Sequence, residues 1–235
     1  MELKFLGRGA AFNPLEGNTS AYFIEGRELF LIDCGETVFE SIMRKGLLED
    51  IDKVNVMITH THSDHIGSLG SLALYCYYNL SSINIIMKDG AKHIKNIDNI
   101  LESVGCPKNR YNYVSEEDLD FKYKSFKTIR YTETIHCSEL DCYSLIFETD
   151  DGVVYFSGDT RELDTLKKLI KKKVDKIFID VSSKDFEGNP HVFIGDLNII
   201  VPDSYRSRVN CMHFNDKKCI DLALKYGFNV IKKSD

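Results

Sequence analysis

The sequence lacks the long apolar segments and flexible linkers that mark several classes of protein. No apolar run approaches the ~20 residues needed to cross a bilayer, which excludes a transmembrane helix and a membrane as partner. Only four prolines occur in 235 residues, and no Gly/Ser-rich stretch divides the chain. With 43% hydrophobic and 28% charged residues, the composition is typical of a globular protein. We therefore expect one domain spanning residues 1–235.

Paired cysteines are also absent. The seven cysteines are scattered and none forms a C-x-x-C motif, so neither a disulfide framework nor a zinc knuckle is indicated. Residues 1–7 turn polar too early for a signal peptide, and we expect a cytoplasmic protein with reduced, mostly buried thiols. The net charge of −6 argues against passive nucleic-acid binding. It leaves a nucleotide substrate open, because bound cations supply positive charge locally.

Strands follow one another directly in some places and alternate with helices in others. Apolar runs predict strands over 2–6, 21–24, 29–32, 54–58, 83–87, 129–132, 143–148, 153–157, 177–181 and 209–212. Helical spacing predicts helices over 38–45, 70–80, 91–104, 163–173, 194–201 and 216–226. This mixture favours two packed mixed sheets with helices outside over a single doubly wound sheet, for which no G-x-G-x-x-G follows a strand.

Two further features have ordinary structural explanations. The basic run 167–176 places its lysines on the solvent face of an apolar-striped helix, so we interpret it as a solvated face and not as a nucleic-acid patch. The aromatic cluster Tyr75–Tyr78 is interpreted as core. A pocket, or the contact with a second copy in a homodimer, is the alternative for this cluster.

A histidine-rich hexapeptide, His60-Thr61-His62-Ser63-Asp64-His65, follows the predicted strand 54–58. Three imidazoles and one carboxylate on a single loop can converge on one point, and the strand gives them a rigid base. These are ligands that zinc, manganese and iron accept. The hexapeptide therefore predicts a metal site.

Four more ligand-type residues come shortly after predicted strands: Asp33, His136, Asp159 and His213. Their shared placement predicts that they face one rim of the sheets. For Asp33, ordinary turn chemistry explains the pattern equally well.

Together, His60-x-His62-x-Asp64-His65, His136, Ser157-Gly158-Asp159-Thr160 and His213 resemble the motifs of the metallo-β-lactamase-fold hydrolases, in that family's order. The resemblance implies an αββα sandwich of two mixed β-sheets with helices on the outer faces. It also implies two divalent metal ions on the rim, with Zn²⁺ expected and Mn²⁺ or Fe as alternatives.

By the same resemblance, His60, His62 and His136 would hold the first metal, and Asp64, His65 and His213 the second. Asp159 would bridge both metals, and Asp33 would support the site from behind. Two such cations lower the pKa of a shared water and generate a hydroxide nucleophile. Asp64, as a ligand beside that water, is a candidate to orient it or accept its proton.

Within this family, residues 5–21 and 139–143 and the position of His191 resemble the ribonuclease Z-like and cyclic-phosphodiesterase branches. In those branches a histidine in the position of His191 is not a ligand but lies close to the scissile phosphate. His191 is therefore a catalytic candidate that protonates the leaving oxygen or holds a phosphate oxygen, the alternative being an ordinary loop histidine. The interval between His136 and Asp159 is too short for the long arm of tRNA-processing enzymes.

We therefore expect a phosphodiesterase acting on a small nucleotide or cyclic phosphodiester, with folded tRNA disfavoured as a partner. Two alternatives stay open. One is a lactone- or thioester-hydrolysing enzyme on the same site, and the other is a non-catalytic metal-binding sensor. Loss of His191 would cripple phosphodiester cleavage and affect acyl chemistry less.

Overall fold

The computed structural model describes residues 1–88 and 93–234 and has two six-stranded sheets at its centre. The first sheet contains, in spatial order, β1 (Lys4–Gly7), β2 (Ser20–Glu25), β3 (Glu28–Ile32), β4 (Lys53–Met57), β5 (Ser82–Met87) and β6 (Asn112–Ser115). The second contains β12 (Asn229–Val230), β11 (Val209–Met212), β10 (Lys176–Asp180), β9 (Gly152–Phe156), β8 (Cys142–Thr149) and β7 (Thr128–Thr134).

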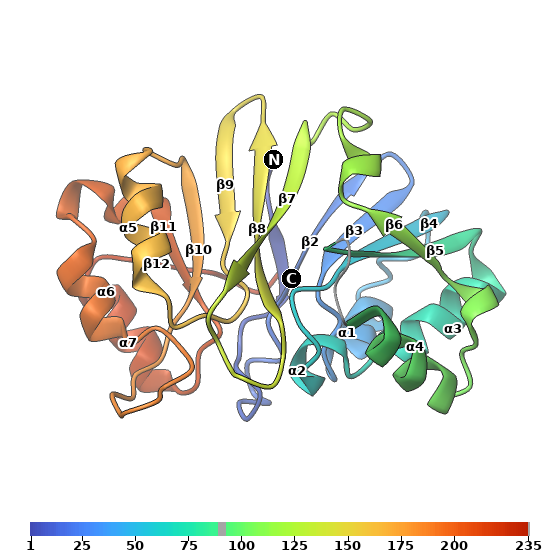
Figure 1. Ribbon diagram of the computed structural model, residues 1–235, viewed down its shortest axis with the longest axis horizontal. Coiled ribbons are helices and arrows are strands. Elements are labelled where there is room, and N and C mark those ends of the chain that lie inside the picture. Colours follow the sequence, from blue (N-terminus) through green and yellow to red (C-terminus); the bar gives the residue numbers. More distant parts are fainter. Residues whose placement is uncertain (89–92, 235) are drawn as a thin grey trace.

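Helices cover the outer faces of both sheets (Figure 1). The first half of the chain supplies α1 (Val38–Arg44), α2 (Ser63–Ile66), α3 (Leu69–Asn79) and α4 (His93–Ser103), and the second half supplies α5 (Leu163–Lys171), α6 (Ile194–Ile200) and α7 (Lys217–Lys225). Short 3₁₀ helices occur at Lys108–Arg110, Glu117–Leu119 and Asp203–Arg208. This is the αββα sandwich expected from the sequence.

The two sheets repeat one topology. In each, the first three strands pair antiparallel, and each later strand joins its neighbour in parallel. Parallel neighbours place their carboxyl ends at the same edge of a sheet. In Figure 1 the arrowhead of β9 points to the lower edge, where α2 also lies. The segments that follow β3, β4, β9, β10 and β11 therefore share one rim.

The apolar runs form strands because both of their faces are covered. Residues 29–32 of β3 and 177–179 of β10 are buried throughout, as expected for strands packed between a facing sheet and a layer of helices. An aromatic cluster fills part of the space between the sheets, where Phe23 stacks on Phe30 at a centroid distance of 4.7 Å and Phe126 packs edge-on against both. This packed interior holds the rim in place.

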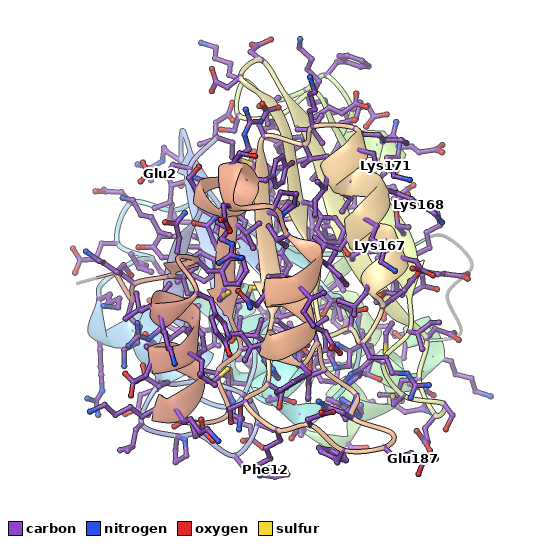
Figure 2. All side chains as sticks on the ribbon, turned by 90° about the vertical axis from the view of Figure 1, so that its left-hand side faces the viewer. Glu2, Phe12, Lys167, Lys168, Lys171 and Glu187 are labelled. Carbon is purple, nitrogen blue, oxygen red and sulfur yellow. The ribbon has the colours of Figure 1, made fainter. Side chains whose placement is uncertain are left out.

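The basic run lies on the exposed side of α5. Leu166 and Leu169 of this helix are buried against the sheet, whereas Lys167, Lys168 and Lys171 are exposed. Figure 2 shows these three lysines on the outer side of the helix. The arrangement agrees with a solvated face.

Some sequence expectations differ from the structure. The short edge strands β6 and β12 were not expected, because neither contains a continuous apolar run. The predicted helix 91–104 starts outside the described residues, and α4 begins at His93. The interpretation of the aromatic cluster as core is wrong for Tyr77 and Tyr78, which are 46% and 68% exposed because they lie on the outward side of α3.

Two composition-based expectations agree with the described residues. All seven cysteines are free, and all except Cys137 are buried. Among residues 1–88 and 93–234, none of the helices has the length and apolar character required to span a membrane.

Candidate metal centre

The predicted ligand residues come together at the shared rim, although they are distant in sequence. They are contributed by the segments after successive strands: Asp33 after β3, His60, His62, Asp64 and His65 after β4, His136 after β7, Asp159 after β9 and His213 after β11. Asp180, at the end of β10, joins them. In Figure 2, Phe12 and Glu187 lie at the lower end of the molecule, on the two loops that border this rim.

Three imidazoles form a first group. His60 Nε2 lies 2.9 Å from His62 Nδ1, which is 3.3 Å from His136 Nε2. The three nitrogens lie within 4.8 Å of one another, so one cation between them could contact all three. His60 and His136 turn their Nε2 atoms inward, whereas His62 turns its Nδ1 inward.

Two carboxylates and two imidazoles form a second group beside the first. Asp64 Oδ2 lies 3.2 Å from His213 Nε2 and 3.4 Å from His65 Nε2. Asp159 Oδ2 lies 3.4 Å from each of the same two nitrogens. These four donors are buried and also lie within 4.8 Å of one another, which makes this group a candidate for a second cation.

Asp159 connects the two groups. Its Oδ2 atom is 3.7 Å from His136 Nε2 and 4.0 Å from His60 Nε2, in addition to its contacts in the second group. Asp159 follows Gly158, which has φ +58° and lies so close to Tyr143 that a Cβ atom would be 2.6 Å from the Tyr143 carbonyl oxygen. Glycine thus permits the turn that presents this carboxylate to both groups.

The electrostatics suit cation ligands. Burial lowers the pKa of His60 well below its ordinary value, so this imidazole is neutral and has a lone pair to donate. Burial also opposes charge on His65, but the carboxylates of Asp159, Asp33 and Asp64 outweigh it and raise the pKa of that imidazole.

One buried atom fits a metal directly. His65 Nε2 is buried and has no hydrogen-bond partner among the described residues, while its ring is held from the other side. Buried polar atoms are nearly always paired, so an unpaired imidazole nitrogen between two carboxylates indicates a missing partner. A divalent cation satisfies the nitrogen and both carboxylates at once.

A further carboxylate holds His65 from behind. Asp33 Oδ2 lies 2.8 Å from His65 Nδ1, and the same carboxylate accepts hydrogen bonds from the Thr59 amide at 2.8 Å and the Thr59 hydroxyl at 2.7 Å. Asp33 has φ 61°, the left-handed region that favours glycine, so its backbone is strained. His136 is held similarly, since its Nδ1 donates to the Pro190 carbonyl at 2.9 Å.

His191 lies beside the first and second donor groups and belongs to neither of them. Its Nδ1 lies 2.8 Å from Asp180 Oδ2 and 3.9 Å from Asp159 Oδ2. Burial would lower the pKa of His191, but the hydrogen bond to Asp180 and the charge of Asp159 raise it to about 9. This imidazole is therefore protonated at neutral pH.

Sequence reasoning missed Asp180 and Cys137. Asp180 is the last residue of β10, but it lay inside the predicted strand 177–181 and so did not stand out as a ligand-type residue after a strand. Cys137 Sγ lies 4.0 Å from His62 Nε2, the ring nitrogen that faces away from the first group. No sequence pattern distinguished Cys137 from the other cysteines.

Comparisons with known proteins agree with this architecture. A family model described as anti-Pycsar protein Apyc1 matches residues 1–233. The anti-Pycsar protein Apyc1 of Bacillus phage 010DV004 is 30% identical, and the alignment covers 92% of this chain and 90% of that protein.

Solved structures show the same fold. The metallo-β-lactamase fold protein YhfI from Bacillus subtilis superposes with a TM-score of 0.77 at 19% identity, covering 99% of this chain and 96% of that one. The short form of human tRNase Z (ELAC1) superposes with a TM-score of 0.70 at 18% identity, covering 100% and 97%. The expected metallo-β-lactamase fold is confirmed.

Proposed function

This chain belongs to the anti-Pycsar protein Apyc1 family, and we propose that it hydrolyses cyclic nucleotides at the rim site. The expectation of a metal-dependent phosphodiester hydrolase is confirmed at the level of the family, whose members degrade cyclic nucleotides. The observation that carries the proposal for this chain is the position of Asp159 Oδ2, within 4.0 Å of imidazoles from both donor groups. One carboxylate is thus placed to serve two cations.

We propose two divalent cations as cofactors, with zinc as the first expectation. His60, His62 and His136 would hold one cation, Asp64, His65 and His213 the other, and Asp159 both. Five imidazoles against two carboxylates favour zinc, with manganese or iron as alternatives. When bound, such a pair of cations lowers the pKa of a shared water and neutralises charge on the phosphate oxygens.

The chain's own residues then supply orientation and a proton. Asp64 is held by His213 and His65, and those imidazoles keep the pKa of its carboxyl below the ordinary value even though burial opposes this. Its carboxylate is thus ionised, and we propose that it orients the attacking water. The water adds to phosphorus as one of the two ring ester P–O bonds breaks, which yields a nucleoside monophosphate.

His191 is proposed to protonate the leaving oxygen. Asp180 holds its Nδ1 at 2.8 Å, and no described residue hydrogen-bonds its Nε2, so the second ring nitrogen is free to face the substrate. A carboxylate behind an imidazole fixes its tautomer and orientation. Asp180 therefore acts as a positioning residue. A proton donor beside the metal ligands favours an ester with a poor alkoxide leaving group over a thioester, whose thiolate leaves without protonation.

A folded tRNA is disfavoured as a substrate. The chain between His136 and Asp159 is occupied by the loop 137–141 and the hairpin of β8 and β9. This leaves no segment for an arm that could grip a large RNA. We also propose that the substrate is a small nucleotide and that the protein is cytoplasmic.

A homodimer is also proposed. Tyr77 and Tyr78 are exposed on α3, and the Arg110 guanidinium lies 4.6 Å and 5.5 Å from their ring centroids. Tyrosine and arginine are the side chains enriched at protein interfaces. Light scattering of the Tyr78→Ser variant should show a lower mass than the wild type.

The test of the function is hydrolysis of cyclic AMP by zinc- or manganese-loaded protein, with His62→Ala as the background. Metal-dependent release of AMP that disappears in the variant is the expected result. Turnover equal to that of His62→Ala would contradict the proposal. Lactones and thioesters would then be the next substrates to assay, followed by a sensor role without turnover.

A further inference from the structure

A hollow of about 620 Å³, here called the terminal groove, lies where the edge strands β1 and β12 of the two sheets come together. Its lining comes from residues 2–5, from β2, from β10 to β12 and from the C-terminal segment 230–234. The C-terminal segment joins the two sheets here, because the Ser234 amide donates to the Phe5 carbonyl at 2.8 Å. The volume is within the range of small-molecule sites, ~300–1,000 Å³.

The terminal groove is separate from the metal centre. Lys176, which lines the groove, begins β10 and lies four residues before Asp180, or about 13 Å along an extended strand. In Figure 2, Glu2 of the groove lies in the upper part of the molecule, whereas Phe12 lies at the lower end beside the rim. Among the described residues, the groove and the donor groups have no member in common. A ligand in the groove would therefore not occupy the position of the phosphodiester.

Lysines supply most of the charge in the terminal groove. Its lining contains Lys4, Lys176, Lys232 and Lys233 and a single carboxylate, that of Glu2. Within residues 1–88 and 93–234, only Lys233 of these four lysines forms a salt bridge. The groove thus concentrates uncompensated positive charge on a chain whose net charge is −6. Such a local concentration of one sign of charge attracts an anion.

A buried hydroxyl also lines the terminal groove. Tyr22 is only 5% exposed, and its hydroxyl has no hydrogen-bond partner in the described part of the chain. Buried polar groups are nearly always paired, so this hydroxyl indicates a missing acceptor. Tyr22 is the register partner of Lys4 across β2 and β1, and directly opposite side chains project from the same face of a sheet. A hydrogen-bond donor and an ammonium group therefore stand side by side.

We propose that the terminal groove binds a small oligophosphate, an anion with two or more linked phosphate groups. A monoanion would balance only one of the three ammonium groups that lack a salt bridge, whereas an oligophosphate carries several charges. Ammonium groups and a phenolic hydroxyl both donate hydrogen bonds to phosphate oxygens. The ligand would contact the first sheet through Lys4 and Tyr22 and the second through Lys176. It would therefore connect the two sheets at the end remote from the rim.

Isothermal titration calorimetry with inorganic triphosphate and with ATP tests this proposal. The full chain carries Asp159→Ala, so that metal at the rim does not compete for the anion, and the EDTA-treated wild-type chain is a second background. Both should bind triphosphate, and the affinity should fall as the ionic strength rises. Adding Lys4→Gln, Lys176→Gln and Lys232→Gln should raise the dissociation constant about tenfold or more, because each charge contact contributes a small factor.

Two matched controls separate the groove from general attraction. Removing the same number of charges from the exposed face of α5, with Lys167→Gln, Lys168→Gln and Lys171→Gln, should change the dissociation constant little (Figure 2). Tyr22→Phe removes one donor without changing the charge and should raise the dissociation constant about threefold, the scale of one hydrogen bond. Tyr75→Phe, at a partly buried tyrosine of α3, should have no effect.

The two probes distinguish the source of the phosphate chain. Tighter binding of ATP than of triphosphate would identify a nucleotide as the ligand, and equal or weaker binding would identify the free anion. No binding in either background, or equal losses in the groove and α5 variants, would overturn the proposal.

Activity separates this proposal from the proposed function. The metal-loaded chain with the three groove substitutions should hydrolyse cyclic AMP like the wild type, since the groove is remote from the rim. Loss of hydrolysis in that folded variant would make the groove part of the substrate site and overturn a separate anion site. If the wild type hydrolyses no cyclic nucleotide but binds triphosphate in the groove, the proposed function fails and this inference stands.

Discussion

Asp33 Oδ2 and His65 Nδ1 lie 2.8 Å apart, although the two residues follow different strands of the first sheet. Both side chains are almost completely buried, with exposures of 1% and 2%. The contact fixes the ring of His65 so that its unpaired Nε2 lies 3.4 Å from both Asp64 and Asp159. Asp33 thus orients the His65 ring toward the second donor group, although Asp33 itself is not a member of that group.

Asp33→Asn should weaken metal binding without abolishing it. Partners behind a ligating imidazole typically contribute ~10–100-fold in metal affinity, because they set the orientation and basicity of the ring. A competition titration with a chromophoric chelator measures this change. Asp221→Asn, on the exposed side of α7, controls for the loss of one negative charge. An affinity equal to that of the wild type would mean that His65 is not a ligand or is oriented by other contacts.

Asp159→Ala should reduce metal at both positions, whereas His62→Ala should reduce it at one. The difference follows from Asp159 contacting imidazoles of both groups and His62 belonging only to the first. Elemental analysis after dialysis gives the metal content per chain. Identical metal content in the two variants would contradict a bridging carboxylate.

His191→Ala should keep the metal content and lower the phosphodiesterase rate by ~10²-fold or more, the usual scale for a general acid. Asp180→Asn should lower the same rate by a smaller factor, since His191 stays in place but loses the carboxylate that orients it. Steady-state kinetics of cyclic AMP hydrolysis, with metal analysis on the same samples, measures both. An unchanged rate in His191→Ala would make His191 an ordinary loop residue. A double variant no slower than His191→Ala is expected if Asp180 acts through His191.

Asp98→Asn should destabilise the fold away from the rim. Asp98 is buried, accepts hydrogen bonds from the hydroxyls of Tyr111 at 2.8 Å and Tyr113 at 3.0 Å, and pairs with Lys108. Substitution should lower the free energy of unfolding at pH 7 by about 1–3 kcal/mol, the scale for a disrupted hydrogen bond to a buried charge. Urea denaturation measures the loss, and an equal stability for both proteins would contradict it.

The free energy of unfolding that Asp98→Asn loses should be larger at neutral pH than in acid. Burial alone would raise the pKa of Asp98, but Lys108 and the two tyrosines outweigh it and hold that pKa below the ordinary value. The carboxylate therefore contributes stability above its unfolded pKa of ~3.9, and the contribution is lost as the pH falls through the folded value. The difference between wild type and Asp98→Asn should shrink in acid.

The two sheets could be predicted from the sequence because strands covered on both faces must be apolar along their whole length. Residues 29–32 and 177–179 carry that pattern, and both became strands. The edge strands β6 and β12 could not be predicted in this way. Their stability comes from pairing with β5 and β11, which is a tertiary contact that their own residues do not encode.

The sequence alone determined that the histidine-rich hexapeptide and the other ligand-type residues lie at the ends of strands, because each follows an apolar run in the chain. Their convergence within 4.8 Å was decided only by the tertiary structure, since it depends on how two sheets pack. The same holds for the pairing of Asp180 with His191 and for the terminal groove between the edges of the two sheets. A sequence fixes which chemical groups a chain carries and where its strands end. The distances between groups on different strands follow only from packing, in which many weak contacts act together.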